Sequence, residues 1–268
     1  MTTGTPTIPD EVVATVADAG WITVFSGAGM SADSGVPTFR DAQTGLWENF
    51  DPATIASPEA WDADPALVWG WYHWRAHLVR DARPNAGHLA LAELSSVGAG
   101  DDERALMVVT QNVDDLHERA GTPVLSHLHG SLFAPRCSVC DTPYDGPDAD
   151  SAVEPEGSKH DPRLTPPTCA VCGGAVRPGI VWFGEHLPAD AWERAENAFR
   201  GADVVLVVGT SGIVYPAASL PERAAASGVP VIEINPEPSA LTEVATHSIR
   251  AGAATALPAL VDAIRRRG

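Results

Sequence analysis

Lysine is almost absent from this chain of 268 residues, because Lys159 is the only one. Acidic side chains outnumber lysine and arginine by 35 to 17, which gives a formal net charge of −18. A surface of this sign repels phosphate backbones and anionic membranes, so we expect neither nucleic acid nor a membrane as a partner. It would attract a basic, lysine-rich polypeptide, although the same charge also serves solubility alone.

Long apolar runs are missing as well. None reaches the roughly 20 residues that a transmembrane helix needs. The N-terminal MTTGTPTIPDEVV lacks the charged start and apolar core of a secretion signal, so we expect a cytoplasmic protein. The chain has only four cysteines, and a reducing compartment disfavours disulfides and leaves metal binding open.

What the sequence does contain is an alternation of short apolar segments with helical ones. We expect strands at 21–25, 105–110, 203–210 and 229–235. We expect five helices. The first runs from Asp10 to about Gly20, the second follows the glycine-rich turn after the first strand, the third begins at Pro65, and the last two span 87–94 and 191–200. This alternation predicts an α/β fold with a Rossmann-like, doubly wound parallel sheet.

Two regions interrupt the alternation. Residues 41–84 hold most of the tryptophans, and residues 131–177 are rich in Pro, Gly and Asp and hold all the cysteines. We therefore expect a helical insertion at 41–84 and a small zinc-binding module at 131–177. The Rossmann-like domain would comprise residues 1–40, 85–130 and 178–268.

The glycine-rich turn SGAGMSADSG follows the first expected strand. Gly27 and Gly29 permit a tight turn and the close backbone approach that a pyrophosphate needs. However, Ala32 stands where a G-x-G-x-x-G motif has its third glycine, and no acidic residue of the usual kind ends a second strand. An ordinary strand–helix turn remains the alternative.

Polar side chains follow three other expected strands, where ligands bind in open α/β sheets. These residues are Gln111, Asn112 and Asp114, then Gly209, Thr210 and Ser211, and finally Asn235 and Glu237. They can contact ribose hydroxyls, a carboxamide or a phosphate. Helix capping by Asn112 or Asp114 and ordinary turn chemistry are the alternatives.

In SHLHG, His127 and His129 alternate, which places both on one face if the segment is a strand. A histidine can act as a general base near neutral pH, and metal ligation by the pair is conceivable. A structural histidine is the alternative. The two C-x-x-C pairs are more specific, since Cys137, Cys140, Cys169 and Cys172 offer four thiolates for one tetrahedral, structural zinc ion.

The segment WGWYHWRAHL places Tyr72 and Arg75 three residues apart, on one face of a helix. From the residues alone we favour an amphipathic helix whose arginine stacks on an indole.

Taken together, these motifs resemble those of the sirtuins, which are NAD-dependent protein lysine deacylases. The segments GAGMSADSGVPTFR, TQNVDDLHERAG, HLHG, the paired CxxC, VWFGE, GTS and INPE occur in the order found in that family. The resemblance runs from about residue 11 to about residue 265.

The resemblance implies a Rossmann-like domain and a zinc-ribbon module, with NAD and acyl-lysine entering the cleft between them. It implies His129 as the catalytic base and Asn112 as a residue that positions ribose or water. The implied NAD pocket consists of Gly27, Ala28, Gly29, Ser31, Phe39, Arg40, Gln111, Asn112, Asp114, Gly209, Thr210, Ser211, Asn235, Glu237 and Ala253.

The resemblance also implies how the substrate is read. Tyr72 and Arg75 match the pair by which one subclass of sirtuins binds succinyl, malonyl or glutaryl lysine, and Ala56 matches the small residue that widens the acyl pocket. The substrate peptide backbone would pair with a strand at VWFGE, through Val181, Phe183, Gly184 and Glu185.

The implied activity removes acetyl and acidic acyl groups, consumes NAD, and releases nicotinamide and O-acyl-ADP-ribose. The alternative is a deacetylase with ADP-ribosyltransferase side activity and no acidic-acyl preference. An NAD-linked dehydrogenase and a non-enzymatic zinc-ribbon binding module are more distant rivals. We expect a monomer.

Overall fold

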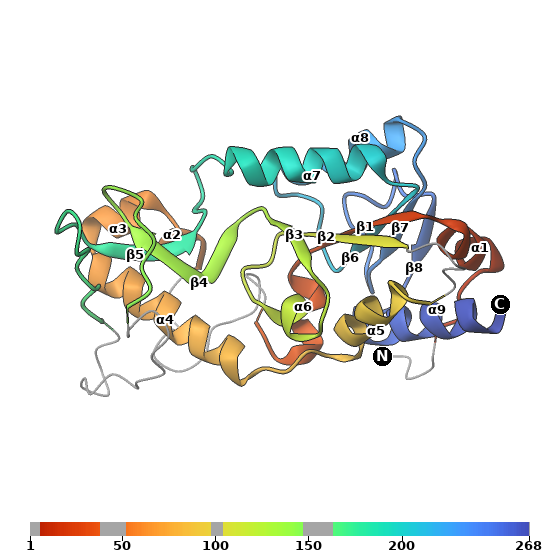
Figure 1. The fold of residues 1–268 in the computed structure, drawn as a ribbon, viewed down its shortest axis with the longest axis horizontal. Helices are drawn as coiled ribbons and strands as arrows, with labels where there is room; N and C mark the ends of the chain where they lie inside the picture. Colours follow the sequence, from red (N-terminus) through yellow and green to blue (C-terminus); the bar gives the residue numbers. More distant parts are fainter. Residues whose placement is uncertain (1–5, 38–51, 98–103, 147–162, 268) are drawn as a thin grey trace.

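The structure is a computed structural model that describes residues 6–37, 52–97, 104–146 and 163–267. It has a large and a small lobe (Figure 1). The large lobe contains α1 (Asp10–Asp18), β1 (Trp21–Ser26), α5 (Ala86–Leu94), β2 (Ala105–Thr110), α6 (Leu116–Arg119), β3 (Val124–His127), α7 (Ala189–Gly201), β6 (Val204–Val208), α8 (Ser219–Ala226), β7 (Val231–Ile234), β8 (His247–Ile249) and α9 (Ala253–Arg267). The small lobe contains α2 (Pro52–Ile55), α3 (Pro58–Ala63), α4 (Pro65–Asp81), β4 (Gly130–Cys137) and β5 (Val176–Ile180).

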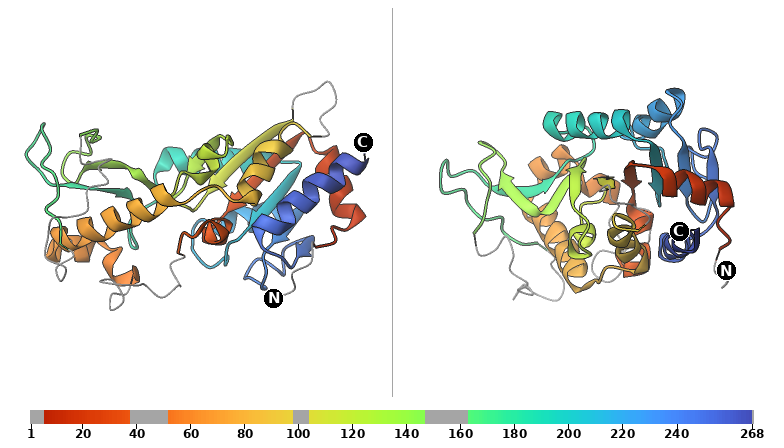
Figure 2. Two further views of the ribbon diagram at one scale, coloured as in Figure 1. Left: turned by 90° about the horizontal axis from the view of Figure 1, so that it is seen from below. Right: turned by 45° about the vertical axis from the view of Figure 1, so that its right-hand side comes forward.

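A parallel sheet forms the centre of the large lobe, with the strand order β3-β2-β1-β6-β7-β8. The predicted α/β class, the parallel sheet and its four predicted strands are confirmed. Helices α1, α5 and α9 pack on one face of the sheet, and α7 and α8 pack on the other (Figure 2).

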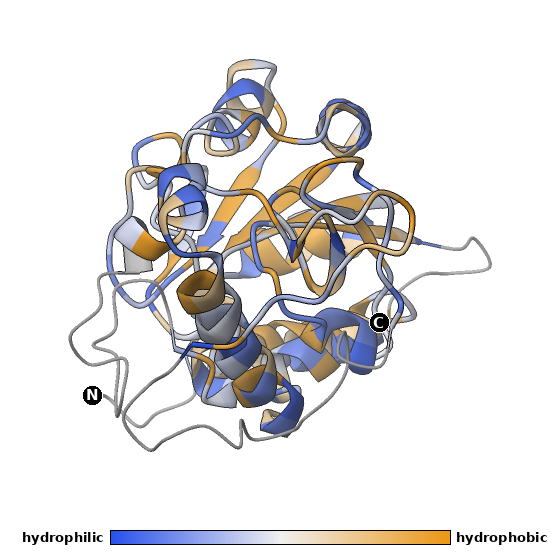
Figure 3. Cartoon of the chain, turned by 90° about the vertical axis from the view of Figure 1, so that its left-hand side faces the viewer, coloured by the Kyte–Doolittle hydropathy of each residue, from blue (hydrophilic) through white to orange (hydrophobic). Residues whose placement is uncertain are grey.

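The strand β6 shows why this sheet is buried on both faces. Its sequence VVLVV has no polar residue, and all five residues are buried. Successive side chains of a strand point to opposite faces. Accordingly, Val204, Leu206 and Val208 join the core on the α9 side, whereas Val205 and Val207 join the core on the α7 side. The apolar strands at the centre of the molecule are visible in Figure 3.

The small lobe is built from both predicted insertions, which share one apolar core. Trp61, Trp71 and Tyr72 from the first insertion pack in the same cluster as Leu132 and Val176 from the second. The strands β4 and β5 pair antiparallel, and α4 lies against both. Helix α4 begins where the sequence predicts, because the Asp64 side chain accepts a hydrogen bond from the Leu67 N–H at 3.0 Å.

Two local expectations are wrong. In the described segment after the glycine-rich turn, residues 28–34 form two short 3₁₀ turns, η1 (Ala28–Met30) and η2 (Ala32–Ser34), in place of the expected α-helix. The second turn ends at Gly35, which has φ +82° and so stops a helix. The second error concerns SHLHG, because β3 ends at His127 and His129 lies in the turn before β4. Within the described ranges, no helix has the combined length and apolar character needed to cross a bilayer.

Candidate active site

The loops after β1 and β6 pack backbone to backbone at the carboxyl edge of the sheet. The Gly29 N–H donates to the Gly209 carbonyl at 2.8 Å, and the Gly27 N–H donates to the Val208 carbonyl at 3.0 Å. A Cβ on Gly29 would lie 2.8 Å from the Gly209 carbonyl oxygen, which is too close for any side chain. The glycines therefore serve the contact between two loops, in addition to any close approach by a ligand.

Three predicted polar residues form one buried group beside these loops. The Ser31 hydroxyl donates to Asp114 Oδ2 at 2.9 Å, and Asn112 Nδ2 donates to Ser31 Oγ at 3.3 Å. All three side chains are buried. Burial raises the pKa of Asp114, and the hydrogen bonds from Ser31 and the Leu116 amide act in the opposite direction.

A second set of contacts joins the ends of β2, β6 and β7. Gln111 Nε2 donates to Thr210 Oγ1 at 2.9 Å, and Asn235 Nδ2 donates to the Thr210 carbonyl at 2.8 Å. The Ser211 carbonyl accepts from the Ala240 amide at 3.1 Å, which ties the loop after β7 to the loop after β6. The structure thus brings together side chains from separate strand ends, as the sequence predicts.

Three other predicted NAD residues lie close by. Ala28 begins η1, and Ala253 is buried at the first residue of α9, a helix that contacts η1. The Glu237 carbonyl accepts a hydrogen bond from Arg250 at 3.3 Å. Phe39 and Arg40 lie outside the described residues.

The pKa values of the two histidines of SHLHG shift in opposite directions. His129 Nδ1 contacts the Gln111 carbonyl at 3.1 Å, so Nδ1 carries the proton and Nε2 keeps its lone pair. Burial lowers the pKa of His129, although the Gln111 carbonyl partly offsets this effect. For His127, burial also lowers the pKa, but the carboxylate of Glu118, 2.7 Å from Nε2, and the Asn112 carbonyl raise it above its usual range. Of the two, His129 is therefore the one whose pKa shift favours the neutral imidazole.

The four cysteines form a cluster that fits zinc. Their sulfurs all lie within 4.8 Å of one another, with Cys137–Cys172 at 3.4 Å and Cys140–Cys169 at 3.8 Å. A zinc ion with Zn–S bonds of about 2.3 Å requires sulfurs about 3.8 Å apart, so a tetrahedral ion fits this cluster. A Cβ on Gly174 would lie 2.7 Å from a Val139 methyl and 3.2 Å from Cys137 Sγ, so the second knuckle requires a glycine.

Tyr72 and Arg75 point into the small-lobe core from α4 and are 3% and 5% exposed. The Arg75 guanidinium lies 5.1 Å from the Trp71 ring centre and 3.5 Å from the Pro37 carbonyl. Burial lowers the pKa of Arg75, and the Tyr72 and Asp114 groups act against this shift, so Arg75 is close enough to the polar strand ends to interact with their charge. The predicted site residues thus come from both lobes.

The comparisons with known proteins agree with this arrangement. Residues 27–216 match the model of the Sir2 family. The chain belongs to the Sir2 family. It is 50% identical over 257 residues to an NAD-dependent protein deacylase of Methylococcus capsulatus, covering 96% of this chain and 97% of the relative. It is 53% identical to NAD-dependent protein deacylase 2 of Corynebacterium efficiens, with 94% of this chain and 95% of the relative covered.

Solved sirtuin structures share the fold. A complex of a Sir2 homolog with NAD superposes with a TM-score of 0.85 at 41% identity and covers 98% of this chain and 96% of that one. A mutant Sir2 homologue bound to ADP-ribose superposes with a TM-score of 0.84 at 41% identity, covering 97% and 98% of the two chains.

In this sirtuin the segment Val181–Glu185 is not a strand, since β5 ends at Ile180. The Val181 N–H donates to the His129 carbonyl at 2.9 Å and the Phe183 N–H donates to the Ala56 carbonyl at 3.0 Å. The Glu185 N–H likewise donates to the Trp182 carbonyl at 3.0 Å. A substrate peptide would therefore find these amides already in use, and its pairing with the segment stays a prediction.

The Glu185 side chain has a partner that sequence reasoning missed. Its carboxylate pairs with both terminal nitrogens of Arg177, at 2.6 and 2.9 Å, and accepts the Trp182 amide. The Arg177 guanidinium carbon lies 3.4 Å from the Trp182 ring centre. Burial would raise the pKa of Glu185, but Arg177 and the Trp182 amide bring it below its usual range. Glu185 thus holds the turn in place, and no sequence signal links it to Arg177.

A second missed residue, Glu233, is a fully buried acid on β7. It accepts hydrogen bonds from Ser239, Thr242 and Ser248 and pairs with Arg250 at 2.8 Å. These contacts fix the loop that carries Asn235 and Glu237. An acid within an apolar strand, VIEI, was the available signal.

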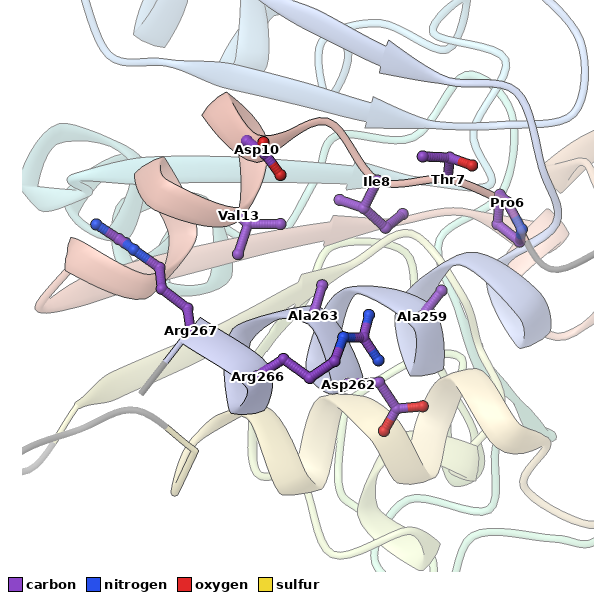
Figure 4. Close-up of a pocket in the computed structure, with 10 residues that line it drawn as sticks. All are labelled: Pro6, Thr7, Ile8, Asp10, Val13, Ala259, Asp262, Ala263, Arg266 and Arg267. Carbon is purple, nitrogen blue, oxygen red and sulfur yellow. The ribbon is translucent and has the colours of Figure 1, made fainter.

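A cavity of about 650 Å³ lies elsewhere on this sirtuin, between the N-terminal segment and α9 (Figure 4). Ile8, Val13, Ala259 and Arg266 are among its lining residues, and none of the predicted site residues is. This cavity is therefore separate from the predicted site residues at the strand ends.

Proposed function

We propose that this chain is an NAD-dependent protein lysine deacylase that prefers acidic acyl groups, with acylated lysine side chains of proteins as substrates. The observation that carries the proposal is the joint placement of Ser31, Asn112, Asp114 and the neutral His129 at the carboxyl edge of the sheet. Relatives about half identical over nearly the whole chain are named NAD-dependent protein deacylases, which supports it.

The residues at the strand ends suit NAD. The tight turns at Gly27, Gly29 and Gly209 leave backbone close to the space a pyrophosphate would take, and Asn235 and Glu237 flank the place for the adenosine ribose. Asn112 would hold the other ribose, and Asp114 the nicotinamide carboxamide. When bound, NAD supplies the ribose carbon that accepts the acyl oxygen as nicotinamide leaves.

His129 has the protonation state that a general base needs. Its Nδ1–H is oriented by the Gln111 carbonyl at 3.1 Å, which leaves Nε2 free to accept a proton from a ribose hydroxyl. Because burial lowers its pKa, the ring is neutral at pH 7. The release of O-acyl-ADP-ribose depends on this proton transfer.

Arg75 and Tyr72 would bind the carboxylate of an acidic acyl group. A carboxylate at the tip of a succinyl or malonyl chain can accept hydrogen bonds from both, and each charged hydrogen bond contributes about 1.5–3 kcal/mol. The Tyr72 hydroxyl is buried and makes no hydrogen bond within the described residues. The indole N–H of Trp182 lies close enough to influence the pKa of Tyr72 but does not reach hydrogen-bond geometry. The stacking of Arg75 on Trp71 supports the alternative, a deacetylase with ADP-ribosyltransferase side activity and no acidic-acyl preference.

The test is one peptide carrying acetyl-, malonyl- or succinyl-lysine, incubated with NAD and followed by mass spectrometry. We expect nicotinamide, free lysine and O-acyl-ADP-ribose, and loss of all three with His129→Ala. Arg75→Met should lower kcat/KM for the succinyl peptide by roughly 10- to 100-fold and change that for the acetyl peptide by less than about threefold. Arg80→Met, which removes a guanidinium from the same helix, is the matched control.

Three results would contradict the proposal or favour the alternative. Equal losses on both peptides with Arg75→Met would exclude recognition of the acyl carboxylate. Labelled ADP-ribose on protein would favour the alternative activity. No release of nicotinamide from any peptide would refute the proposal as a whole.

The surroundings of the enzyme are part of the same proposal. The net charge of −18 supports basic protein substrates and disfavours nucleic acid and anionic membranes. Four thiolates positioned for zinc suit a reducing compartment, so we place the enzyme in the cytoplasm as a monomer.

A further inference from the structure

Two buried histidines lie behind the site and have no part in the reaction described above. His88, near the start of α5, and His117, on α6, are 0% and 1% exposed, and their ring centres are 5.0 Å apart at an interplanar angle of 66°. Burial lowers the pKa of His88 to about 4. Burial, together with the nearby His88 and His127, lowers the pKa of His117 to about 3. Both rings are therefore neutral at pH 7.

The proton on His88 can be assigned from its contacts. Its Nδ1 accepts a hydrogen bond from the Asn85 N–H at 3.3 Å, so Nδ1 has the lone pair and Nε2 carries the proton. Nε2 is buried and has no hydrogen-bond partner within the described residues. A neutral His88 thus presents an unused donor.

His117 presents the complementary atom. Its Nε2 lies 2.9 Å from the Ser26 hydroxyl, which donates to Thr110 Oγ1 at 2.8 Å. Because Ser26 has only one proton to give, Nε2 of His117 must donate to Ser26, and Nδ1 then has the lone pair. Nδ1 is also buried without a partner in the described part of the chain.

We propose that one bound water links the His88 Nε2–H to His117 Nδ1, and that this pair positions the catalytic loops from behind. This inference rests on the proposed function. The pair completes a chain of hydrogen bonds that begins at Asn85. The chain continues through His117 and Ser26 to Thr110 Oγ1, which accepts the Asn112 N–H at 3.0 Å.

Both ends of this chain hold residues of the site. Asn85 Nδ2 donates to the Met30 carbonyl at 2.9 Å and to Ser34 Oγ at 3.0 Å, so it fixes the loop after β1. The other end fixes the Asn112 amide, next to the Gln111 carbonyl that orients His129. The bonds from Asn85 to Thr110 run in one direction and polarise one another. The Asn112 N–H donates to the shared acceptor Thr110 Oγ1 from the opposite side, so a break in the chain frees the atom that holds this amide.

The first experiment is ¹⁵N NMR of histidine-labelled, zinc-loaded, full-length protein at pH 7, with the signals assigned by His88→Asn and His117→Gln. We expect both rings neutral with the proton on Nε2. A proton on Nδ1 of His117 would place two donors face to face and overturn the proposal, as would a charged ring. Because this measurement needs no turnover, its result is independent of whether the chain is a deacylase.

The second experiment separates positioning from simple packing. His117→Gln keeps an N–H donor for Ser26 and adds an amide oxygen that can accept in place of Nδ1, whereas His117→Leu removes both. His88→Asn keeps an acceptor for the Asn85 amide but removes the Nε2 donor. On the order of a 10- to 100-fold fall in kcat is expected for His117→Leu and for His88→Asn at saturating NAD and peptide, because small misplacements of catalytic groups are costly.

His117→Gln should keep kcat within about threefold of the wild type, and the double variant His88→Asn/His117→Leu should be no worse than either single variant. Equal losses with Gln and Leu, or additive losses in the double variant, would contradict the proposal. A lower Tm with unchanged kcat would do the same. If His117→Leu does not fold, the NMR result on the wild type still decides.

Discussion

The predicted polar site residues at the strand ends of the large lobe bond to one another, whereas the Tyr72 hydroxyl of the small lobe has no such partner among the residues that the structure describes. Ser31, Asn112 and Asp114 form a closed group of hydrogen bonds at the strand ends. In the small lobe the Tyr72 hydroxyl and the Trp182 indole N–H are buried without hydrogen-bond partners in the described ranges. Buried polar groups without partners are costly, so the Tyr72 hydroxyl and the Trp182 N–H suit a polar ligand at this position.

The difference shows that the two lobes are stabilised in different ways. The large lobe is held by a sheet with apolar residues on both faces, and its site residues are already oriented by backbone and side-chain contacts. The small lobe instead depends on an aromatic core, the Arg177–Glu185 pair and four thiolates around one position. Disrupting the small lobe alone should therefore reduce zinc content and activity, whereas disrupting the large lobe alone should weaken NAD binding.

The largest effect should come from Cys137→Ser, which removes a buried thiolate from the small lobe. We expect loss of zinc, unfolding of the small lobe and a fall in activity of at least about 100-fold, because metal binding and folding are coupled. Zinc content by mass spectrometry, near-ultraviolet circular dichroism and deacylation are the measurements.

Ser138→Ala in the same knuckle is the matched control and should retain zinc. The Cys137→Ser variant should still bind ADP-ribose within about tenfold of the wild-type affinity, since the large lobe supplies most of the ADP-ribose site. Full activity without zinc would remove the structural role of the cluster.

A smaller effect is expected when the large lobe is disturbed through Glu233→Gln. The amide keeps only one acceptor oxygen, while Ser239, Thr242, Ser248 and Arg250 all donate to the carboxylate. We expect the KM for NAD to rise about tenfold, with kcat and zinc content little changed, because loss of one charged network loosens the adenosine-side loop. Initial rates at varied NAD give both constants.

Glu243→Gln, an exposed acid of the same segment, should leave both constants unchanged. If Glu233→Gln lowered kcat and left KM alone, the loop would not control binding of the adenosine end.

The smallest effect should be the pH dependence of deacylation, which reports on one ring in the large lobe. Protonated His129 cannot accept a proton, and its pKa is lowered from 6.5 by burial. We therefore expect kcat/KM to fall on acidification with a midpoint below 6.5 and to level off above it. His127, with its raised pKa, would titrate above 6.5, and His127→Gln should remove any inflection there. A single midpoint above 6.5 that survives His127→Gln would argue against His129 as the base.

Much of the large lobe could be predicted because its information is local. A run such as VVLVV specifies a doubly buried strand by itself, and polar residues after each strand specify the edge where they meet. The four cysteines were predictable for the same reason, since the spacing within each C-x-x-C encodes a knuckle.

The rest depends on partners far apart in the chain. Nothing around Trp61 indicates that it packs in one core with Val176, and nothing around Arg177 indicates a stack on Trp182. The helix expected after the glycine-rich turn gave way to 3₁₀ turns, because the Ser31 side chain bonds to Asp114 and Gly35, with φ +82°, ends the second turn. Tertiary contacts overrode local preference at these positions.

The position of β1 at the centre of the sheet has a kinetic consequence. Ile22 pairs with Leu106 on one side and with Val204 on the other, so each pairing closes a long loop, and both loops contain small-lobe segments. The entropy of closing such loops must be overcome before the central strands gain any stabilising contact. Refolding from denaturant should therefore be slow, with apolar strand edges exposed to aggregation until the chain's two distant halves meet.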